Sequence, residues 1–376
     1  MLIKNLFKEL EIYRRAKIAV EMISAPGIGK SDSIVQYVEW LKKMNPGKTV
    51  GYGVMFVATY TPVDLLGYMV PTKDANGDLI TTFTKPQWLY STEGKLLSEY
   101  DIAVLFMDEY GQGEPDVKKG TAELFLHGKI GPHYVGPNCM RVAASNRQSD
   151  RSGVTKSLDF VINRRAEIHL TTNYECWSEW AVAHNKPTVF MFYAKQHGDE
   201  KIFTNDVPKT QGPWPTARSY TMAIDYLEAK RQVMEEQGIP WENYGCNDQQ
   251  TAAENINALT GIVGEAMAGD IVGFIRMREA LPDFDEIVAD PENCKLPSTP
   301  DARYLAVHEC AYRVTDKNIT QVVKFINRVP QEYSVTFAKA VMARQPKLLL
   351  NRDYQKFMQS NQALINAFAT NTAAAA

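Results

Sequence analysis

Five short apolar runs, separated by segments with helical periodicity, make up the first half of the chain. These runs lack the strict alternation that marks a half-exposed strand, and continuous runs are typical of strands that helices cover on both faces. After the first run, residues 32–43 place Ile34, Val38 and Leu41 on one stripe of a helix. The pattern predicts an α/β fold with a parallel sheet, whose strands lie at residues 18–24, 49–59, 102–107, 140–145 and 166–170.

Two segments interrupt this alternation with the pattern of a β-hairpin. Residues 67–89 contain two strand-like stretches on either side of Asn76-Gly77, a dipeptide that favours a tight two-residue turn. A second, smaller hairpin is expected at residues 128–135, just before the fourth apolar run. We therefore expect two hairpin insertions in the α/β part of the chain.

From about Trp214 onward the pattern becomes helical. Residues 251–275 carry apolar residues at helical spacing, including Ile256, Leu259 and Val263, and this predicts a helix. Prolines separate several of the helical segments. Further helices are expected at residues 300–314, 319–328, 332–344 and 354–369, with Thr299 as the N-cap of the first.

Composition narrows the class of protein. The chain has 376 residues, 45% hydrophobic and 23% charged, which suits a globular protein of two or three packed units. Its 41 basic and 44 acidic residues give a net charge of −3, so a broad basic surface for nucleic acid is not expected. No stretch approaches the roughly 18 apolar residues of a membrane helix, and the first residues do not form a signal peptide. The five cysteines lack metal-ligand spacing, so we expect reduced thiols in a cytoplasmic protein.

A glycine-rich segment joins the first apolar run to its helix. It ends in Gly29-Lys30-Ser31, as the phosphate-loop pattern G-x-x-x-x-G-K-[ST] requires, whereas Ser24 stands at the first glycine position. Such a loop points backbone N–H groups at phosphates, and the helix N-terminus adds partial positive charge. The lysine reaches the β- and γ-phosphates, and the serine hydroxyl binds Mg²⁺. The candidate nucleotide-binding residues are Pro26, Gly27, Ile28, Gly29, Lys30, Ser31 and Asp32.

Two carboxylates follow the third apolar run. Asp108 and Glu109 end a predicted buried strand, and ligands of parallel sheets bind at the carboxyl edge where such strands end. Asp108 is expected to hold Mg²⁺, and Glu109 is expected to orient and polarise an attacking water. Alone, this pair also fits an ordinary strand end with solvated acids. Because the phosphate loop and the acidic pair do not need each other for folding, their co-occurrence favours nucleotide hydrolysis.

Three further polar positions follow in order along the chain. Asn146 ends the fourth run, where its side chain can hold the lytic water near the γ-phosphate. Arg164 and Arg165 precede the fifth run and could project from a subunit edge to stabilise charge on a neighbour's γ-phosphate. We weight the choice between them toward Arg164. Arg218 begins the helical half and could contact the phosphates.

This ordered set resembles the Walker A, Walker B, sensor 1, arginine-finger and sensor 2 motifs of AAA+ ATPases. Residues 64–68, Asp-Leu-Leu-Gly-Tyr, resemble the D-L-x-G segment of the MoxR-like branch, which belongs to the dynein-related helix-2-insert clade. The two hairpins match that branch's insert in helix 2 and its hairpin before sensor 1. The resemblance covers roughly residues 15–275. Two positions depart from the family pattern: Ser24 replaces the first glycine, and Arg165 stands where the family has an aromatic residue.

The resemblance implies a P-loop NTPase core with a five-stranded parallel sheet of order 5-1-4-3-2. It implies an α/β core over residues 1–212, an α-helical lid over 213–280 and a C-terminal helical extension over 281–376. It also implies ATP and Mg²⁺ as cofactors, with Ser31 and Asp108 as the metal ligands. Finally, it implies a ring of subunits, usually six, that remodels a protein partner, often one with a von Willebrand A domain.

Two other functions stay open from the sequence alone. One is a nucleic-acid motor similar to McrB-type or helicase-type members of the clade. In the first hairpin, the charges of Lys73 and Lys85 are balanced by those of Asp74 and Asp78. This near-neutral charge favours a protein client over DNA. The second is a nucleotide-gated scaffold with slow turnover. The presence of Glu109, which is expected to activate water for hydrolysis, argues against it.

Overall fold

The computed structural model describes residues 1–150, 152–155, 158–239, 241–278, 282, 284–298, 300–344 and 346–361. The chain divides into two compact units. The first comprises Met1–Lys186 and Ala194–Ile224, and the second comprises Pro187–Tyr193 and Asp225–Ala376. The division at residues 213 and 281 that the family resemblance implies stays a prediction.

The first unit is built on a parallel sheet of five strands, as the apolar runs predict. The sheet order is β2-β5-β8-β1-β9, and every pairing in it is parallel. Each strand overlaps one predicted run, and the bounds are β1 Val20–Ser24, β2 Val50–Phe56, β5 Ile102–Asp108, β8 Cys139–Asn146 and β9 Ala166–His169.

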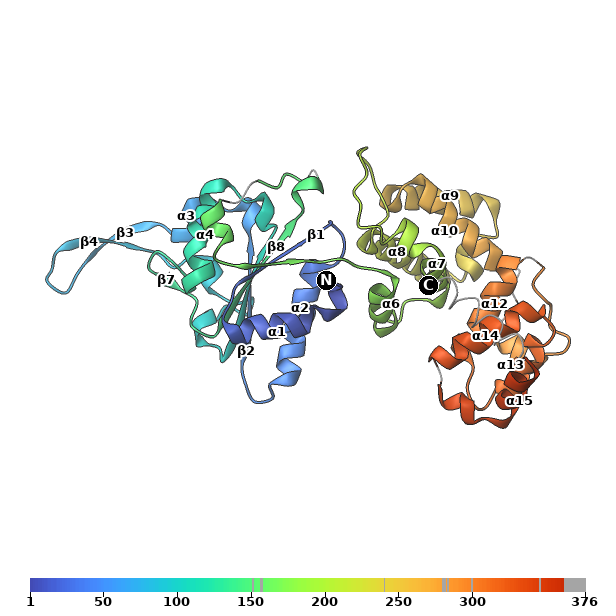
Figure 1. Cartoon of the computed structure of the whole chain (residues 1–376). Helices are drawn as coiled ribbons and strands as arrows, with labels where there is room; N and C mark the ends of the chain where they lie inside the picture. The colour runs from blue at the N-terminus through green and yellow to red at the C-terminus, as the bar shows by residue number, and fades with distance from the viewer. Residues whose placement is uncertain are drawn as a thin grey trace. The chain divides into compact units, whose positions relative to one another are not determined.

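Both faces of the sheet are covered at β5, which explains why this strand is apolar up to its last residue. Along β5, Val104 and Phe106 belong to the core shared with helices α1 (Leu6–Ala16) and α2 (Lys30–Met44). Leu105 belongs to the opposite core, which is shared with α4 (Pro115–His127). The helices on the two faces can be followed in Figure 1. Alternate residues therefore enter different cores, and polar positions within the strands are exceptional.

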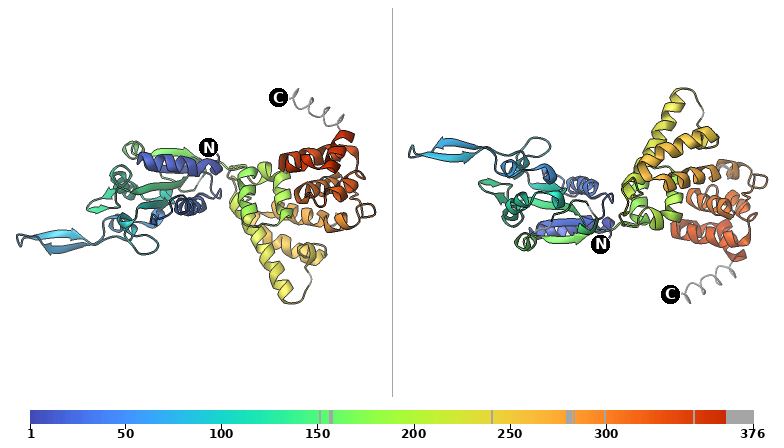
Figure 2. Two further views of the ribbon diagram at one scale, coloured as in Figure 1. Left: turned by 90° about the horizontal axis from the view of Figure 1, so that it is seen from below. Right: turned by 90° about the horizontal axis from the view of Figure 1, so that it is seen from above.

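Both predicted hairpins are confirmed. The first pairs β3 (Met69–Lys73) with β4 (Leu79–Phe83), follows the short helix α3 (Pro62–Leu66) and projects away from the sheet (Figures 1 and 2). In its turn, the Asp74 carboxylate accepts hydrogen bonds from the backbone N–H groups of Asn76 and Asp78. Gly77 adopts a left-handed φ of 86°, which favours glycine at this position. The second hairpin pairs β6 (Lys129–Ile130) with β7 (His133–Tyr134).

The run of helices that follows the last strand of the sheet starts earlier than the sequence pattern predicts. Helices α6 (Tyr174–Ala183) and α7 (Thr188–Lys201) precede Trp214, and α8 (Ala217–Glu236) follows it. The short helix α5 (Asp159–Ile162) lies between β8 and β9 in the chain. The prediction that this run of helices begins near residue 214 is therefore wrong, because α6 and α7 come before that residue.

The second unit is helical. The helix predicted at residues 251–275 is two helices, α9 (Gln249–Val263) and α10 (Glu265–Arg278), because Gly264 between them has φ 83° and ψ 158°. The later predicted helices are confirmed where the structure describes them, while Thr299 and the end of the last helix lie outside the described residues. Their bounds, with the additional α11, are α11 Phe284–Ala289, α12 Pro300–Arg313, α13 Ile319–Ile326, α14 Gln331–Arg344 and α15 Arg352–Ser360. None of the described helices combines the length and apolar character needed to cross a membrane.

Candidate functional site

The loop between β1 and α2 has the backbone that a phosphate loop needs. Gly27 and Gly29 have φ values of 78° and 97°, in the left-handed region that favours glycine. A Cβ on Gly29 would meet no atom within 4 Å, so the space beside it is open for a ligand. A Cβ on Gly27 would lie 2.6 Å from Oγ1 of Thr216, and the Gly27 carbonyl accepts a hydrogen bond from the N–H of Arg218 at 2.9 Å. The loop is therefore packed against the segment that begins α8.

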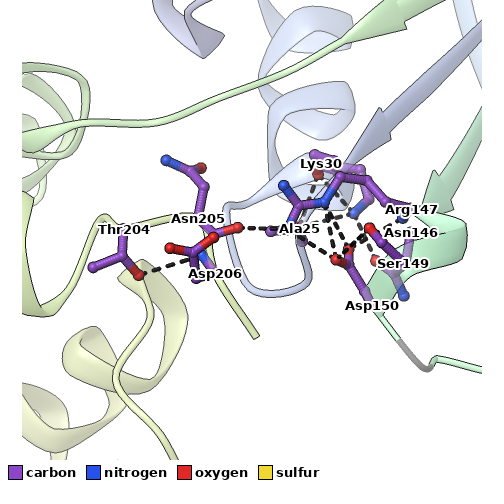
Figure 3. Close-up of polar contacts among 10 residues, drawn as sticks. Ala25, Lys30, Asn146, Arg147, Ser149, Asp150, Thr204, Asn205 and Asp206 are labelled. Carbon is purple, nitrogen blue, oxygen red and sulfur yellow. Dashed lines mark hydrogen bonds and ion pairs between the residues drawn. The ribbon is translucent and has the colours of Figure 1, made fainter. Parts of the chain in front are cut away.

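The ammonium of Lys30 points back into this loop and toward β8. It donates hydrogen bonds to Oγ of Ser24 at 2.9 Å, to the carbonyl of Ala25 at 3.3 Å and to Oδ1 of Asn146 at 2.9 Å (Figure 3). Asn146 is the last residue of β8 and is 8% exposed. The loop lysine and the candidate sensor asparagine, which are 116 residues apart in sequence, are therefore in direct contact.

The charges around Lys30 come from the other candidate residues. Burial lowers the pKa of Lys30 to about 8. The carboxylate of Glu109 is the strongest opposing influence, and Asp108 and Asp150 also raise this pKa, whereas Arg218 lowers it further. Each effect requires the charge to be near the ammonium, so three charged residues predicted from the sequence, Asp108, Glu109 and Arg218, gather around Lys30 at one edge of the sheet.

Ser31 and Asp108 supply the donor atoms expected for a magnesium site. The Ser31 hydroxyl, at the start of α2, donates to Oδ2 of Asp108 at 2.8 Å. The described residues contain no cluster of three or more His, Cys, Asp or Glu side chains that could hold a metal ion. Mg²⁺ typically uses one or two protein oxygens together with waters and substrate phosphates, so one hydroxyl and one carboxylate fit this ion.

Glu109 has an unusual backbone conformation. Its φ of 49° and ψ of 36° are left-handed, which is uncommon for a residue other than glycine and costs of order 1–2 kcal/mol. The short 3₁₀ helix Tyr110–Gln112 starts directly after it. Such backbone strain clusters at functional sites, where it fixes the direction of a side chain.

A polar cluster that the sequence reasoning missed extends the site from Asn146. Arg147 donates from Nε to Oδ1 of Asp150 at 2.9 Å and from Nη2 to the carbonyl of Asn205 (Figure 3). Asn205 donates in turn from its side chain to the carbonyls of Thr172 and Phe203. Arg147 directly follows Asn146 in sequence, which was an available signal, whereas nothing in the sequence marks Asn205.

The two candidate finger arginines have opposite environments. The guanidinium of Arg164 lies 5.4 Å from the ring centroid of Phe160, whose side chain is exposed. The side chain of Arg165 is only 2% exposed and forms an ion pair with Glu21. The expectation that Arg165 could project from a subunit edge is therefore wrong, because its charge is buried and paired. Arg164 remains the candidate at the surface.

Arg218 is exposed and stands second in α8. Its backbone N–H is hydrogen-bonded to Gly27 of the loop, and the charge of its side chain acts on Lys30. This placement agrees with a residue that contacts phosphates bound by the loop.

Comparisons with known proteins add little to this description. No protein-family model matches the chain, and no curated protein matches it. Among solved structures, the chain is similar to a protein from Cytophaga hutchinsonii that is described as a "putative ATPase". The two chains share 15% identity over 87% of this chain and 89% of the other, with a TM-score of 0.34. At this distance the neighbour does not assign an activity to the chain.

Proposed function

We propose that this chain is an ATPase of the AAA+ type that binds Mg-ATP at the carboxyl edge of its parallel sheet. The proposal rests on direct contacts between the phosphate loop with its helix and the last residues of β8 and β5. Lys30 contacts Asn146 at 2.9 Å, and Ser31 contacts Asp108 at 2.8 Å. A lysine, a hydroxyl, a carboxylate and an amide gathered beside an open glycine loop are the groups that phosphoryl transfer requires.

Each residue has a role that its position supports. Lys30 and the N–H groups of the loop would hold the phosphates. Ser31 and Asp108 would hold Mg²⁺, which neutralises charge on phosphate oxygens when bound. Glu109 would orient the attacking water and accept its proton, and Asn146 would help to place that water.

We further propose that the active form is a ring of subunits, with six as the expected number, similar to MoxR-like proteins. Arg164 would then act on the γ-phosphate of a neighbouring subunit, and Arg218 would act at the phosphates beside the loop. Support for this comes from the exposure around Arg164 and from the link between Arg218 and Gly27.

The first hairpin favours a protein client, with a von Willebrand A domain protein as one candidate. Three of its side chains are among the most exposed of the large apolar side chains that the structure describes, namely Tyr68 at 74%, Met69 at 72% and Leu79 at 76%. Exposed apolar groups of this size are typical of protein-binding surfaces, whereas nucleic-acid surfaces are basic. A nucleic-acid motor is therefore the less favoured function, and rapid turnover by the assembled protein would exclude a slow nucleotide-gated scaffold.

The proposal is tested by separating ATP binding from ATP hydrolysis. Purified wild-type protein is expected to release phosphate from Mg-ATP. Lys30→Ala is expected to lose nucleotide binding, whereas Glu109→Gln is expected to bind ATP and not hydrolyse it. Glu99→Gln, at an exposed glutamate outside the site, serves as the matched control and should behave as wild type. Unchanged ATP affinity in Lys30→Ala would refute the site.

A further inference from the structure

A buried ion pair lies in the middle of the sheet, on the face covered by α4. Glu21 of β1 is 3% exposed, and the side chain of Arg165 is 2% exposed. Arg165 donates from Nε and Nη2 to the Glu21 carboxylate, which also accepts a hydrogen bond from the Ser145 hydroxyl. The guanidinium lies 5.6 Å from the ring centroid of Tyr110 and 5.4 Å from that of Phe125.

This pair is not explained by stability alone. Removing two charges from water costs several kcal/mol per ion, and well-packed apolar residues of similar volume are often as stable. The Nη1 atom of Arg165 is also buried and has no hydrogen-bond partner among the described residues, so the pair is incompletely satisfied there. Buried ion pairs of this kind can instead fix one arrangement of the groups around them.

The members of the pair and its contacts stand next to site residues in the sequence. Ser145 directly precedes Asn146, which contacts Lys30. Arg165 directly follows Arg164, the candidate finger, and Tyr110 directly follows Glu109. A chain of contacts, Ser145 to Glu21 to Arg165, therefore runs from the phosphate side of β8 to the start of β9.

We propose that Ser145, Glu21 and Arg165 are positioning residues that couple the nucleotide held at Asn146 to the placement of Arg164. This inference rests on the proposed function. When a nucleotide binds, Asn146 exchanges its contact with Lys30 for a contact with the nucleotide or its attacking water. The end of β8 and the Ser145 hydroxyl then shift with Asn146. Because Glu21 joins Ser145 to Arg165, the shift reaches Arg164 and its stacking on Phe160. The coupling is reciprocal, so engagement of Arg164 by a neighbour changes the subunit's own affinity for ATP.

The test places a fluorescent reporter beside Arg164. Phe160→Trp, at a site that is 45% exposed, is combined with Glu109→Gln so that ATP binds without turnover. The reporter's emission is followed as Mg-ATP is added, after subtraction of the signal of the Glu109→Gln protein. Ser145→Ala and Glu21→Gln are then introduced separately. Ser91→Ala is the matched control, because it removes a buried hydroxyl of the same unit that bonds the Tyr100 hydroxyl and no member of the ion pair.

We expect ATP to change the emission of the reporter protein and of the Ser91→Ala control. The change should be lost in Ser145→Ala and Glu21→Gln, while their ATP dissociation constants stay within about twofold of the parent. In proteins with Glu109 restored, the two variants should lower kcat by about tenfold or more, a small part of the roughly 10³–10⁵ in rate that a well-placed finger arginine contributes. Ser145→Ala removes a single atom, so it keeps the test valid if Glu21→Gln fails to fold.

An emission change of parental size in both variants, or no change in the parent although ATP binds, would overturn the coupling and leave the proposed ATPase intact. Failure of the parent to bind ATP would overturn the proposed function, and the coupling with it.

Discussion

The Ser31 hydroxyl donates a hydrogen bond to the carboxylate of Asp108 at 2.8 Å, across 77 residues of sequence. Ser31 is the second residue of α2 and Asp108 is the last residue of β5, and β5 is separated from β1 by β8 in the sheet. The contact therefore joins the two halves of the candidate site that sequence motifs identify independently. It also brings together the two side chains that would hold Mg²⁺.

Asp108→Asn should weaken the use of Mg²⁺ more than the binding of ATP. The substitution keeps the size of the side chain and removes the charge that would hold the ion, so the Mg²⁺ concentration for half-maximal hydrolysis should rise about tenfold or more. The measurement is the phosphate-release rate across Mg²⁺ concentrations at fixed ATP, with chelation of Mg²⁺ abolishing wild-type activity. Asp101→Asn, at the exposed residue directly before the same strand, is the control. An unaltered Mg²⁺ requirement in Asp108→Asn would contradict the metal site.

Glu109→Asn should make the protein more stable and inactive. Asn tolerates the left-handed backbone of this position better than Glu, so we expect a gain of about 0.5–1 kcal/mol in the free energy of unfolding. Urea unfolding measures this gain, and phosphate release measures the loss of hydrolysis. Glu109→Gln loses the same charge without relieving the backbone and should show no such gain. Equal stabilities of the two variants would mean that the strain has no energetic consequence.

Arg218→Ala should slow hydrolysis at least about tenfold while the phosphate loop keeps its structure. The loop is held to α8 by the backbone N–H of Arg218, and this hydrogen bond survives the substitution. Steady-state kinetics should therefore show the effect chiefly in kcat. Arg231→Ala removes an arginine of the same helix that is already paired with Glu228 and Glu235, and it should be silent. A wild-type kcat in Arg218→Ala would remove Arg218 from the site.

The buried Lys118 should make stability depend on pH above neutrality. Burial lowers its pKa to about 8 from the ordinary 10.5, and Glu21 opposes this effect. Between these two pH values the unfolded chain binds more protons than the folded chain, so the free energy of unfolding rises with pH in this window. In this pH window, the free energy of unfolding of the wild type should rise relative to that of Lys118→Met by up to about 1.4 kcal/mol per pH unit.

Urea unfolding at several pH values from about 7 to about 10.5 measures this difference. Lys119→Met, at the exposed neighbour that pairs with Asp116, should retain the wild-type slope. Parallel pH profiles for the wild type and Lys118→Met would show that Lys118 titrates normally in the folded protein.

Nucleic acid should not stimulate hydrolysis at moderate salt. The first hairpin is nearly neutral and presents apolar side chains, so it lacks the cations that neutralise phosphates. Phosphate release is measured with single- and double-stranded DNA at about 50 mM and about 200 mM salt. Strong stimulation that falls steeply with salt would instead favour the nucleic-acid motor.

Local patterns were sufficient for the sheet and for the centre of the site. The apolar runs predicted all five strands because both faces of the sheet are covered, and Asn76-Gly77 predicted the first hairpin because only a few residue pairs fit its turn. The phosphate loop and Asp108 could be found because each motif is contiguous in sequence. Their direct contact follows from the parallel topology, which brings strand ends to one edge.

Features that depend on distant partners could not be predicted. Arg165 looks like a surface arginine in sequence, because its partner Glu21 lies 144 residues away. The predicted helix at 251–275 failed at Gly264, since helical periodicity continues past a residue whose backbone leaves the helix. Asn205 joins the site through its backbone carbonyl, and a carbonyl group leaves no signal in the sequence.

Ser24 gives the loop a property that a glycine there would not. The lysine ammonium has three N–H donors, and oxygens of Ser24, Ala25 and Asn146 accept from it. A triphosphate bound as proposed would have to exchange with these internal ligands, so its net gain per hydrogen bond would be small. The serine would then compete with the nucleotide, and the protein would hold it less tightly, and release it more readily, than a chain with glycine at this position.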